Sequence, residues 1–328
     1  MNNEFVVNHK KDIVFMFSGQ GSQYYGMAYN LYKENVIFKE WMDRLDAYIT
    51  QKYKLSIIEE LYYSGKTMLD TFDRLVYSSS AIFMIEYSLY QLLNQLDIKP
   101  AYILGESMGL FTCLTIAGAM EPEVMIDFII NEAYVFEEKC EKGGMIAILD
   151  DYRIYRNFSC LYNNSELVSI NAENHFIVSG KEAGIQIIKD FLIANKIAYF
   201  KLPVLYAFHS NHIDAAAKEY KKIADMLLLP DSLKIKILGI KDERIINSCI
   251  SEFLWEVVRG KVKTAEILAG IKEAEEIVLV DLGPSGTLAN IAKKIVNPKV
   301  NIFSIITPFQ GEIKNLKNLK AFFANYNY

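Results

Sequence analysis

A serine between two glycines carries the strongest chemical signal in this sequence. Residues 105–109 read Gly-Glu-Ser-Met-Gly, which matches the pattern G-x-S-x-G around Ser107. The apolar residues 98–104 before the motif indicate a short buried strand, and residues 110–120, rich in small side chains, indicate a helix. A serine on a tight strand-to-helix turn is a nucleophile elbow, in which the hydroxyl is exposed and the following N–H groups face its target. The motif therefore indicates either a nucleophilic serine at position 107 or a plain glycine turn, and the flanking strand and helix favour the nucleophile.

A second glycine-rich turn lies near the start of the chain. Residues 18–23 read Ser-Gly-Gln-Gly-Ser-Gln and follow a continuous apolar run, residues 13–17. The two glycines around Gln20 let this backbone approach another group closely. The spacing fits neither the dinucleotide fingerprint nor the phosphate-binding loop of nucleotide hydrolases, so a nucleotide site is disfavoured.

The histidines and cysteines form no metal-binding pattern. Of the four histidines, only His209 and His212 are close in sequence, and no third ligand has usable spacing. We expect no metal site, and we interpret His212 and His175 as ordinary structural residues. The four cysteines lack C-x-x-C spacing, which is typical of reduced core residues in a cytoplasmic protein.

Composition excludes several classes of protein. The net charge is −5, with 35 basic against 40 acidic residues, whereas a nucleic-acid-binding protein would have a basic face. Hydrophobic residues make up 52% of the chain, which is ample for a packed core. No apolar run approaches the ~18 residues of a membrane span. The first residues do not read as a secretory signal, so we expect a cytoplasmic location.

Strands and helices alternate around the two glycine-rich turns. Residues 13–17 and 276–281 are apolar runs of the kind found in strands buried on both faces of a parallel sheet. Residues 28–64, 79–96 and 121–140 have apolar positions at helical spacing. The last of these segments has Pro122 at the position where proline suits a helix start.

The pattern changes between residues 142 and 205. There, strands at 145–149, 167–170, 175–180 and 198–202 surround a helix at 181–196, which is typical of a ferredoxin-like α+β unit. We therefore predict an α/β fold with an α/β-hydrolase-like large domain, residues 1–141 and 206–328. This domain has a parallel sheet and the nucleophile elbow, and a small ferredoxin-like domain, residues 142–205, is inserted in it.

Four motifs in order resemble a known family across nearly the whole chain. They are residues 17–23 (FSGQGSQ), the elbow, residues 207–210 (AFHS) and residues 281–286 (DLGPSG). Together they resemble the malonyl-CoA:acyl-carrier-protein acyltransferases of fatty-acid and polyketide synthesis. The chain is most similar to the free-standing proteins of trans-acyltransferase polyketide synthase clusters, including the acyl hydrolases.

The resemblance implies a Ser–His pair and no cofactor. Ser107 would be the nucleophile and His209 its general base, oriented by a backbone carbonyl in residues 262–264. The family's oxyanion hole consists of backbone N–H groups that match Gln20 and Met108 here. Such donors stabilise the tetrahedral intermediate after thioester attack. The acyl group would arrive on coenzyme A or on the phosphopantetheine of a carrier protein.

Two acidic residues depart from the family pattern. The family reads G-H-S-x-G-E, whereas Glu106 precedes the serine here. Malonyl-specific members have an arginine 25 positions after the serine, where its guanidinium binds the malonyl carboxylate. That position is Glu132 here, and the first arginine after the elbow is Arg153. We expect Glu132 to line the acyl pocket.

A carboxylate at position 132 would repel a malonyl carboxylate. Losing the ion pair should cost about 3–5 kcal/mol, or a factor of ~10² to 10⁴ in binding. One hypothesis is a hydrolase that removes acyl groups from carrier proteins, with Glu132 and Glu106 helping to hold a water. The alternative is an acyltransferase for a neutral or amino-acyl group, with Glu132 pairing an amine. A non-catalytic docking protein would lack Ser107 or His209.

The expected partners are an acyl carrier protein and a polyketide synthase, not nucleic acid or a membrane. Carrier proteins are acidic, so a basic rim should receive one. The candidates for this rim are Arg259, Lys261, Lys263, Lys293 and Lys294.

Overall fold

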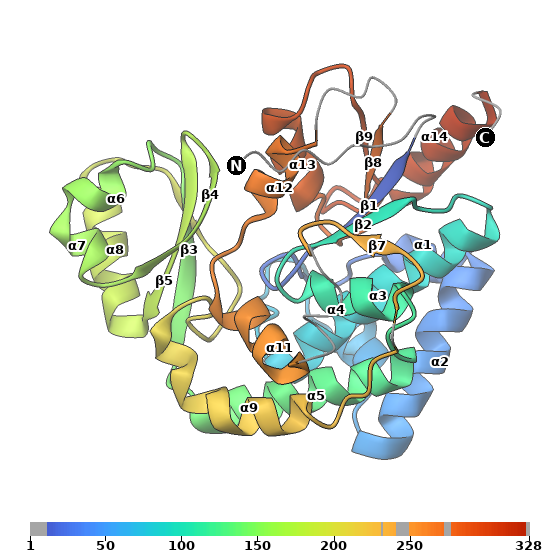
Figure 1. The fold of residues 1–328 in the computed structure, drawn as a ribbon, viewed down its shortest axis with the longest axis horizontal. Coiled ribbons are helices and arrows are strands. Elements are labelled where there is room, and N and C mark those ends of the chain that lie inside the picture. Colours follow the sequence, from blue (N-terminus) through green and yellow to red (C-terminus); the bar gives the residue numbers. More distant parts are fainter. Residues whose placement is uncertain (1–11, 231, 241–248, 272–276, 326–328) are drawn as a thin grey trace.

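A five-stranded parallel sheet forms the centre of the larger part of the molecule (Figure 1). The structure, a computed structural model, describes residues 12–230, 232–240, 249–271 and 277–325. The strand order is β7-β2-β1-β8-β9. The bounds are β1 (Ile13–Phe17), β2 (Tyr102–Gly105), β7 (Lys236–Ile237), β8 (Val278–Asp281) and β9 (Asn301–Ser304). This confirms the predicted α/β fold with a parallel sheet.

The strand register brings three glycine-containing turns to one edge of the sheet: residues 18–23, the elbow, and residues 282–286. Phe17 pairs with Gly105, and Met16 pairs with Asp281. The turns that follow β1, β2 and β8 therefore begin side by side at the carboxyl edge. Ligands bind at this edge in open α/β sheets, because loops from separate strands meet there.

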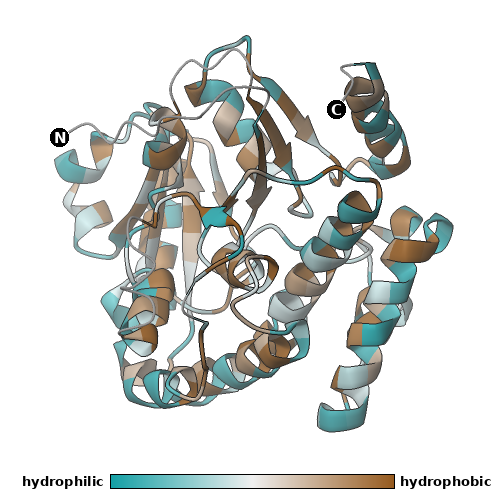
Figure 2. Cartoon of the chain, turned by 45° about the vertical axis from the view of Figure 1, so that its right-hand side comes forward, coloured by the Kyte–Doolittle hydropathy of each residue, from teal (hydrophilic) through white to brown (hydrophobic). Residues whose placement is uncertain are grey.

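Alternate residues of the strands pack on two helical layers. Phe15 and Val280 face one core, which includes α2 (Val36–Tyr53), α3 (Leu75–Gln95) and α5 (Pro122–Lys139). Val14 and Leu279 face the other core, with α12 (Thr264–Ala269) and α13 (Thr287–Ile295). Figure 2 shows apolar strands inside and mixed faces on the outer helices. The continuous apolar run of β1 follows from this burial on both faces.

A second, antiparallel sheet lies beside the first, with strand order β4-β5-β3-β6 (Figure 1). Its strands are β3 (Gly143–Ile148), β4 (Glu166–Ala172), β5 (His175–Lys181) and β6 (Tyr199–Lys201). Helices α6 (Ile154–Asn157), α7 (Ser159–Tyr162) and α8 (Glu182–Ala194) complete a βαββαβ order. This arrangement is ferredoxin-like, as predicted. The exact domain boundaries stay a prediction.

The small sheet also has two different faces. Ile146 and Val178 pack against α8 through Ile185 and Ile188. The opposite face presents Met145, Val168 and Ile177 to the main core. The alternation of side chains along each strand thus turns one face of the small sheet toward the large one.

The predicted helical region 28–64 is interrupted in the structure. It contains α1 (Tyr29–Glu34), α2 and a π-helical turn, η1 (Glu59–Tyr63). The Asn35 side chain accepts a hydrogen bond from the Phe38 N–H and begins α2, and Lys54, at φ 58°, ends it. Local caps therefore break a pattern that apolar periodicity alone reads as continuous.

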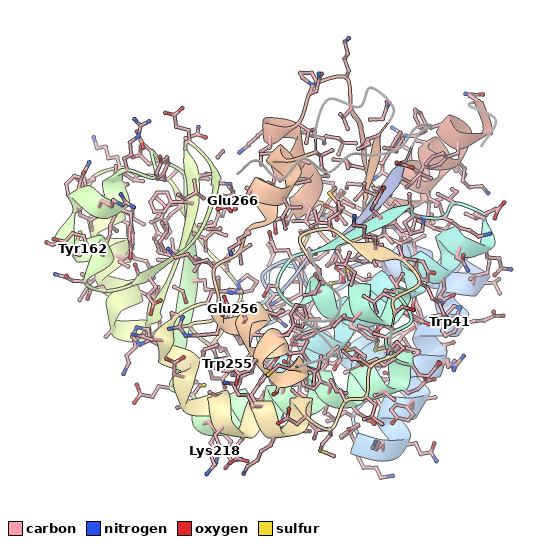
Figure 3. All side chains as sticks on the ribbon, viewed as in Figure 1. Trp41, Tyr162, Lys218, Trp255, Glu256 and Glu266 are labelled. Carbon is pink, nitrogen blue, oxygen red and sulfur yellow. The ribbon has the colours of Figure 1, made fainter. Side chains whose placement is uncertain are left out.

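Other elements near the C-terminal end were not specified from sequence. They are η2 (Asn211–Ala216), α9 (Ala217–Ala224), α11 (Ile250–Arg259) and α14 (Glu312–Asn325), together with β7 and β9. Trp255 projects from α11 (Figure 3), and its ring packs on Tyr220 of α9, with ring centroids 5.3 Å apart. The predicted strand 276–281 corresponds to β8, and its residue 276 lies outside the described residues. None of the described helices has the length and apolar character needed to span a bilayer.

Candidate active site

Ser107 occupies a strained turn between β2 and α4 (Gly109–Ile116). Its φ is 51°, in the left-handed region that non-glycine residues rarely adopt. A Cβ on Gly105 would lie 2.5 Å from the Leu110 Cα, and one on Gly109 would lie 2.1 Å from the Phe17 carbonyl oxygen. Both glycines are therefore required by backbone packing, which explains why the motif contains them.

The loop after β1 lies directly against this elbow. A Cβ on Gly19 would come within 2.7 Å of the Glu106 carbonyl oxygen, so only glycine allows the approach. The Ser18 N–H donates to Glu86 Oε1 at 2.8 Å, and the Thr112 hydroxyl donates to Glu86 Oε2 at 2.8 Å. Burial raises the pKa of Glu86 well above its ordinary value. Glu86 thus ties the loop to α4, a role that its place in an apolar helix did not reveal.

Asp281 holds the turn that follows β8, residues 282–286, at the carboxyl edge of the sheet. Its side chain accepts hydrogen bonds from the backbone N–H groups of Gly283 and Ala289, both at 2.8 Å. Burial raises the pKa of Asp281 to about 7. The carboxyl therefore holds the turn against the start of α13.

His209 lies between the serine and the end of α11. Its Nε2 is 2.9 Å from Ser107 Oγ, and its Nδ1 is 2.7 Å from the Gly260 carbonyl oxygen. A carbonyl oxygen only accepts, so Nδ1 carries the proton and Nε2 is free to accept from the serine. The imidazole is 4% exposed, and burial lowers the pKa of His209 to about 4. The ring is therefore a neutral base at pH 7.

The carbonyl that orients His209 is not in residues 262–264, where the sequence analysis expected it. Gly260 follows the last turn of α11, and its own N–H bonds back to the Glu256 carbonyl at 2.8 Å. The Val262 N–H instead pairs with the Val168 carbonyl of β4, at 3.1 Å. The Gly260 carbonyl, at the end of α11, thus points at the histidine. Which carbonyl does so depends on the residue where α11 ends.

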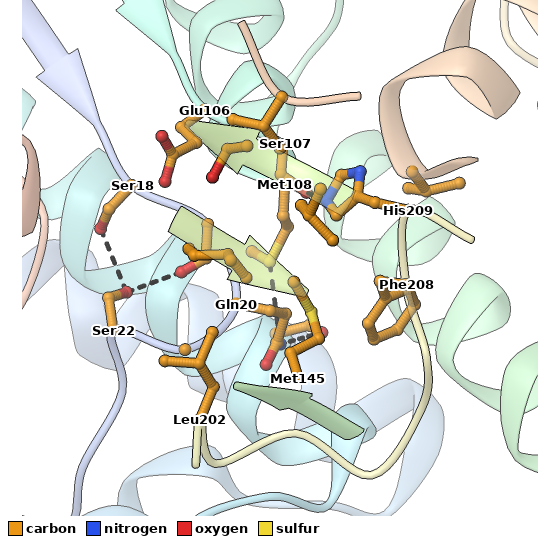
Figure 4. Close-up of a pocket in the computed structure, with 18 of the residues that line it drawn as sticks. Ser18, Gln20, Ser22, Glu106, Ser107, Met108, Met145, Leu202, Phe208 and His209 are labelled. Carbon is orange, nitrogen blue, oxygen red and sulfur yellow. Dashed lines mark hydrogen bonds between the residues drawn. The ribbon is translucent and has the colours of Figure 1, made fainter. Parts of the chain in front are cut away.

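Gln20 and Met108 lie together beside the nucleophile (Figure 4). The Gln20 side chain donates to Ser79 Oγ at 2.6 Å and contacts Met108 Sδ at 3.9 Å. The backbone N–H groups of Gln20 and Met108 make no hydrogen bond to any described residue. Both are thus unused donors at the cavity, as an oxyanion hole requires.

A cavity of about 110 Å³ opens next to Ser107, between the two sheets (Figure 4). An apolar protein cavity of about 150 Å³ holds a benzene molecule, so this one suits a short acyl group. Most of its lining is apolar, and no arginine or lysine is among the described residues around it. The apolar side chains are Leu75, Met108, Phe136, Met145, Val168, Ile177, Leu202, Phe208, Val258 and Val262.

Glu132 lines this cavity from α5, where the sequence analysis expected it. It is 5% exposed, and burial raises the pKa of Glu132 to about 8. The nearby Tyr220 hydroxyl opposes this shift and lowers the pKa of Glu132. The carboxyl is therefore mainly neutral at pH 7, which corrects the negative charge that the sequence analysis assigned to it. A malonyl carboxylate would therefore meet no repulsion from Glu132, but no arginine or lysine among the described lining residues would compensate its charge.

Glu106 also borders the cavity, half-buried beside the nucleophile. Burial raises the pKa of Glu106, and a hydrogen bond with the Thr264 side chain opposes this shift. Its Oε2 atom is buried and has no hydrogen bond to a described group. Glu106 thus provides an unoccupied acceptor site near Ser107.

The basic residues proposed for the rim differ in their surroundings. Arg259 pairs with Asp214 at 2.7 Å and lies 3.6 Å from Glu166. The four other candidates are exposed and form no ion pair with a described residue: Lys261, Lys263, Lys293 and Lys294. The charge of Arg259 is therefore compensated within the chain, whereas the lysines keep theirs with respect to the described residues.

The remaining histidines lie away from the reaction centre. His175 is on β5 and His212 is in η2, and neither lines the cavity. Burial, and then Lys294, lower the pKa of His175. Among the described residues, no three histidine, cysteine or acidic side chains cluster as metal ligands. The four cysteines are free thiols.

Comparisons with known proteins agree with this arrangement. Over 316 residues the chain is 40% identical to "Polyketide biosynthesis acyltransferase homolog PksD" of Bacillus subtilis, covering 94% of this chain and 96% of that protein. It is 36% identical over 313 residues to "Polyketide biosynthesis acyltransferase homolog BaeD" of Bacillus velezensis, covering 94% and 95%.

Solved structures show the same fold at low identity. The acyltransferase domain from module 8 of the salinomycin polyketide synthase has a TM-score of 0.81 at 18% identity, covering 95% of this chain and 75% of that one. The malonyl CoA-acyl carrier protein transacylase of Coxiella burnetii has a TM-score of 0.77 at 19% identity, covering 95% and 98%. Residues 14–327 match the acyl transferase domain family, so the chain belongs to this family.

Proposed function

We propose that this protein is a trans-acting acyl hydrolase of polyketide biosynthesis that removes acyl groups from acyl carrier proteins. Membership in the acyl transferase family supports an enzyme acting on acyl thioesters. The names of its two Bacillus relatives support the polyketide setting. The finer assignment, hydrolysis of short uncharged acyl groups, rests on the cavity beside Ser107.

The first half of the reaction forms an acyl-enzyme. Ser107 Oγ attacks the thioester carbonyl while His209 Nε2, 2.9 Å away, takes the hydroxyl proton. The N–H groups of Gln20 and Met108 stabilise the oxyanion of the tetrahedral intermediate. When the C–S bond breaks, His209 returns the proton to the phosphopantetheine thiolate, and the acyl group stays on Ser107. No metal or redox cofactor takes part.

The second half releases the acyl group to water. His209 takes a proton from water as its oxygen attacks the ester carbonyl, and then returns the proton to Ser107 Oγ as the free acid forms. The unbonded Oε2 of Glu106 offers an acceptor for that water. In an acyltransferase, the thiol of a second carrier protein would take the place of the water.

The observation that carries the acyl-group assignment is the electrostatic character of the cavity. No arginine or lysine is among the described residues of its lining, and its acid Glu132 is mainly neutral at pH 7. Burying a carboxylate without a partner is unfavourable, so malonyl groups should be rejected. Apolar walls such as Phe136 and Met145 instead favour uncharged acyl chains.

An acyltransferase for a neutral or amino-acyl group is the second candidate. Two observations favour it: the family itself, and the buried Oε2 of Glu132, which has no hydrogen bond to a described residue. An acyl-chain ammonium could occupy that acceptor if Glu132 became ionised. Both candidates use the same Ser107–His209 chemistry and differ in the final acceptor.

The decisive experiment follows the fate of the acyl group by intact mass. Carrier proteins bearing acetyl, butyryl, malonyl or alanyl groups are incubated with the enzyme and a second, unacylated carrier protein. The hydrolase predicts loss of acetyl and butyryl mass with release of free acid and no mass gain on the second carrier. Gain on the second carrier would establish transfer instead. Ser107→Ala is the matched control, and equal turnover by this variant would refute the serine assignment.

A further inference from the structure

The hydroxyl of Tyr220 has a fixed hydrogen-bonding direction. Tyr220 is 0% exposed and donates its only proton to the Leu254 carbonyl oxygen at 3.0 Å. Its ring packs among Phe128, Phe136 and Trp255, with centroids 5.6, 5.7 and 5.3 Å away. Because a carbonyl only accepts and the ring cannot turn freely, the phenol oxygen is left as an acceptor.

This direction determines the state of Glu132. The two side chains are in hydrogen-bonding contact. With the Tyr220 proton committed to Leu254, the contact is favourable only if Glu132 donates to the phenol oxygen. A carboxyl donates only when protonated. This direction favours a neutral Glu132, and burial, which outweighs the opposing effect of Tyr220, raises the pKa of Glu132 to about 8.

A neutral carboxyl that donates its one proton has acceptor capacity left. The buried Oε2 of Glu132 makes no hydrogen bond to a described residue. Glu132 lines the cavity beside Ser107, where a bound acyl chain would lie. A buried acceptor without a donor is unfavourable, so a ligand that brings a donor gains more than an equally large apolar ligand.

We propose that Glu132 selects hydroxyacyl thioesters, with the chain hydroxyl donating to its carboxyl. This inference rests on the proposed acyl-enzyme chemistry at Ser107 and names its substrate class. A hydroxyl fits better than an ammonium, because a cation would need an ionised Glu132. Ionisation would place two acceptors, the carboxylate and the Leu254 carbonyl, around the single Tyr220 proton. An unsubstituted chain would leave the carboxyl unsatisfied.

The test compares acylation of Ser107 by matched substrates on one carrier protein. Butyryl, 2-, 3- and 4-hydroxybutyryl, and 4-aminobutyryl groups are loaded, and the rate of acyl-enzyme formation is read by intact mass. In the wild type, we expect at least one hydroxybutyryl isomer to react about tenfold or more faster than butyryl, because one analogue satisfies the buried acceptor and the other does not.

Two variants separate hydrogen bonding from shape. Glu132→Gln keeps the donor and acceptor pattern of a neutral carboxyl, since an amide N–H can donate to Tyr220 and the amide oxygen remains an acceptor. It should keep the hydroxybutyryl preference within about threefold, whereas Glu132→Met, of similar length, should abolish it. Butyryl acylation in each variant is the internal control for folding, because the result is a ratio within one protein.

Three outcomes would overturn the inference. They are equal rates for butyryl and all hydroxybutyryl isomers, an unchanged preference in Glu132→Met, or a preference for 4-aminobutyryl. These outcomes differ from failure of the proposed function. No acylation of Ser107 by any substrate would remove the chemistry itself, whereas fast butyryl acylation without hydroxyl preference would remove only the role of Glu132. The measured step, formation of the acyl-enzyme, comes before water or a second carrier protein attacks, so the result does not depend on whether the enzyme hydrolyses or transfers the acyl group.

Discussion

Two buried ionisable groups line the cavity and are neutral for the same reason: His209, which with Ser107 forms what we call the reaction end, and Glu132, which forms the selectivity end. Burial lowers the pKa of His209 to about 4 and raises the pKa of Glu132 to about 8. They differ in hydrogen bonding: both ring nitrogens of His209 have partners within the chain, whereas Oε2 of Glu132 has none among the described residues. The hydrogen bonds of the reaction end are therefore formed within the protein, whereas Glu132 can gain a hydrogen-bond partner from a substrate.

The two ends also differ in backbone strain. Ser107 has φ 51° and His209 has φ 60°, whereas Glu132 lies within the regular helix α5. Strained residues persist only where the surrounding structure holds them, and they concentrate at functional sites. The chemistry therefore depends on fixed backbone geometry, and selectivity depends on a side chain. Substitutions at the two ends should have effects of different size and kind.

The largest effect is expected from Ser107→Ala at the reaction end. Removing the nucleophile should abolish the acyl-enzyme and lower kcat by as much as ~10⁶. Intact mass after incubation with butyryl carrier protein measures both effects. Activity within tenfold of the wild type would mean that the serine is not the nucleophile.

His209→Ala should be nearly as damaging, because His209 Nε2 is the group hydrogen-bonded to Ser107 Oγ, at 2.9 Å. The double variant with Ser107→Ala should be no worse than the worse single variant, since both residues act in one step. The measurement is kcat for each of the three variants. Additive losses would show that His209 acts in a separate step.

The selectivity end should reject malonyl groups by a factor of ~10² to 10⁴, because no arginine or lysine among the described lining residues compensates the buried carboxylate. Malonyl-CoA should leave Ser107 largely unmodified, while acetyl-CoA labels it. Glu132→Arg should raise malonyl labelling. The increase should be incomplete, because Glu106 remains near the nucleophile. Rapid malonylation of the wild type and passage to a carrier protein would show that Glu132 does not control this pocket, and would refute the hydrolase proposal.

The smallest effects should appear in the pH profile of butyryl acylation. His209 must be neutral to accept a proton, so activity should fall as pH decreases through about 4, by up to tenfold per unit. Glu132 ionises as pH rises through about 8, so acylation should decline there in the wild type but not in Glu132→Gln. A profile for Glu132→Gln that matches the wild type above pH 8 would assign the alkaline decline to another group.

The raised pKa of Glu132 also predicts that the stability of the fold depends on pH. The folded-state pKa of Glu132, about 8, is above its ordinary value of 4.5, so the folded protein binds more protons than the unfolded chain between these values. The free energy of unfolding should therefore fall as pH rises from about 5 to 8 through this group. Denaturant titrations of Glu132→Gln should show a weaker fall, and an equal fall would place the titration elsewhere.

Local motifs explain why much of the fold and site was predictable. Gly105 and Gly109 are required by contacts within a few residues of Ser107 or with the adjacent strand, so the motif states the geometry directly. The apolar run of β1 reports its burial on both faces. The positions of Gln20, Met108 and Glu132 around the cavity also agree with the prediction, while their roles stay proposals.

What the sequence determined by itself is short-range: the elbow at Ser107, the alternation of strands and helices, and the position of Glu132 relative to the serine. The tertiary structure decided which carbonyl orients His209, because that depends on where α11 ends in space. It also decided that Glu132 is neutral, because burial raises the pKa of its carboxyl and outweighs the opposing effect of Tyr220, 88 positions away in the chain. Desolvation and long-range hydrogen bonds are properties of packing, and the order of residues does not display them.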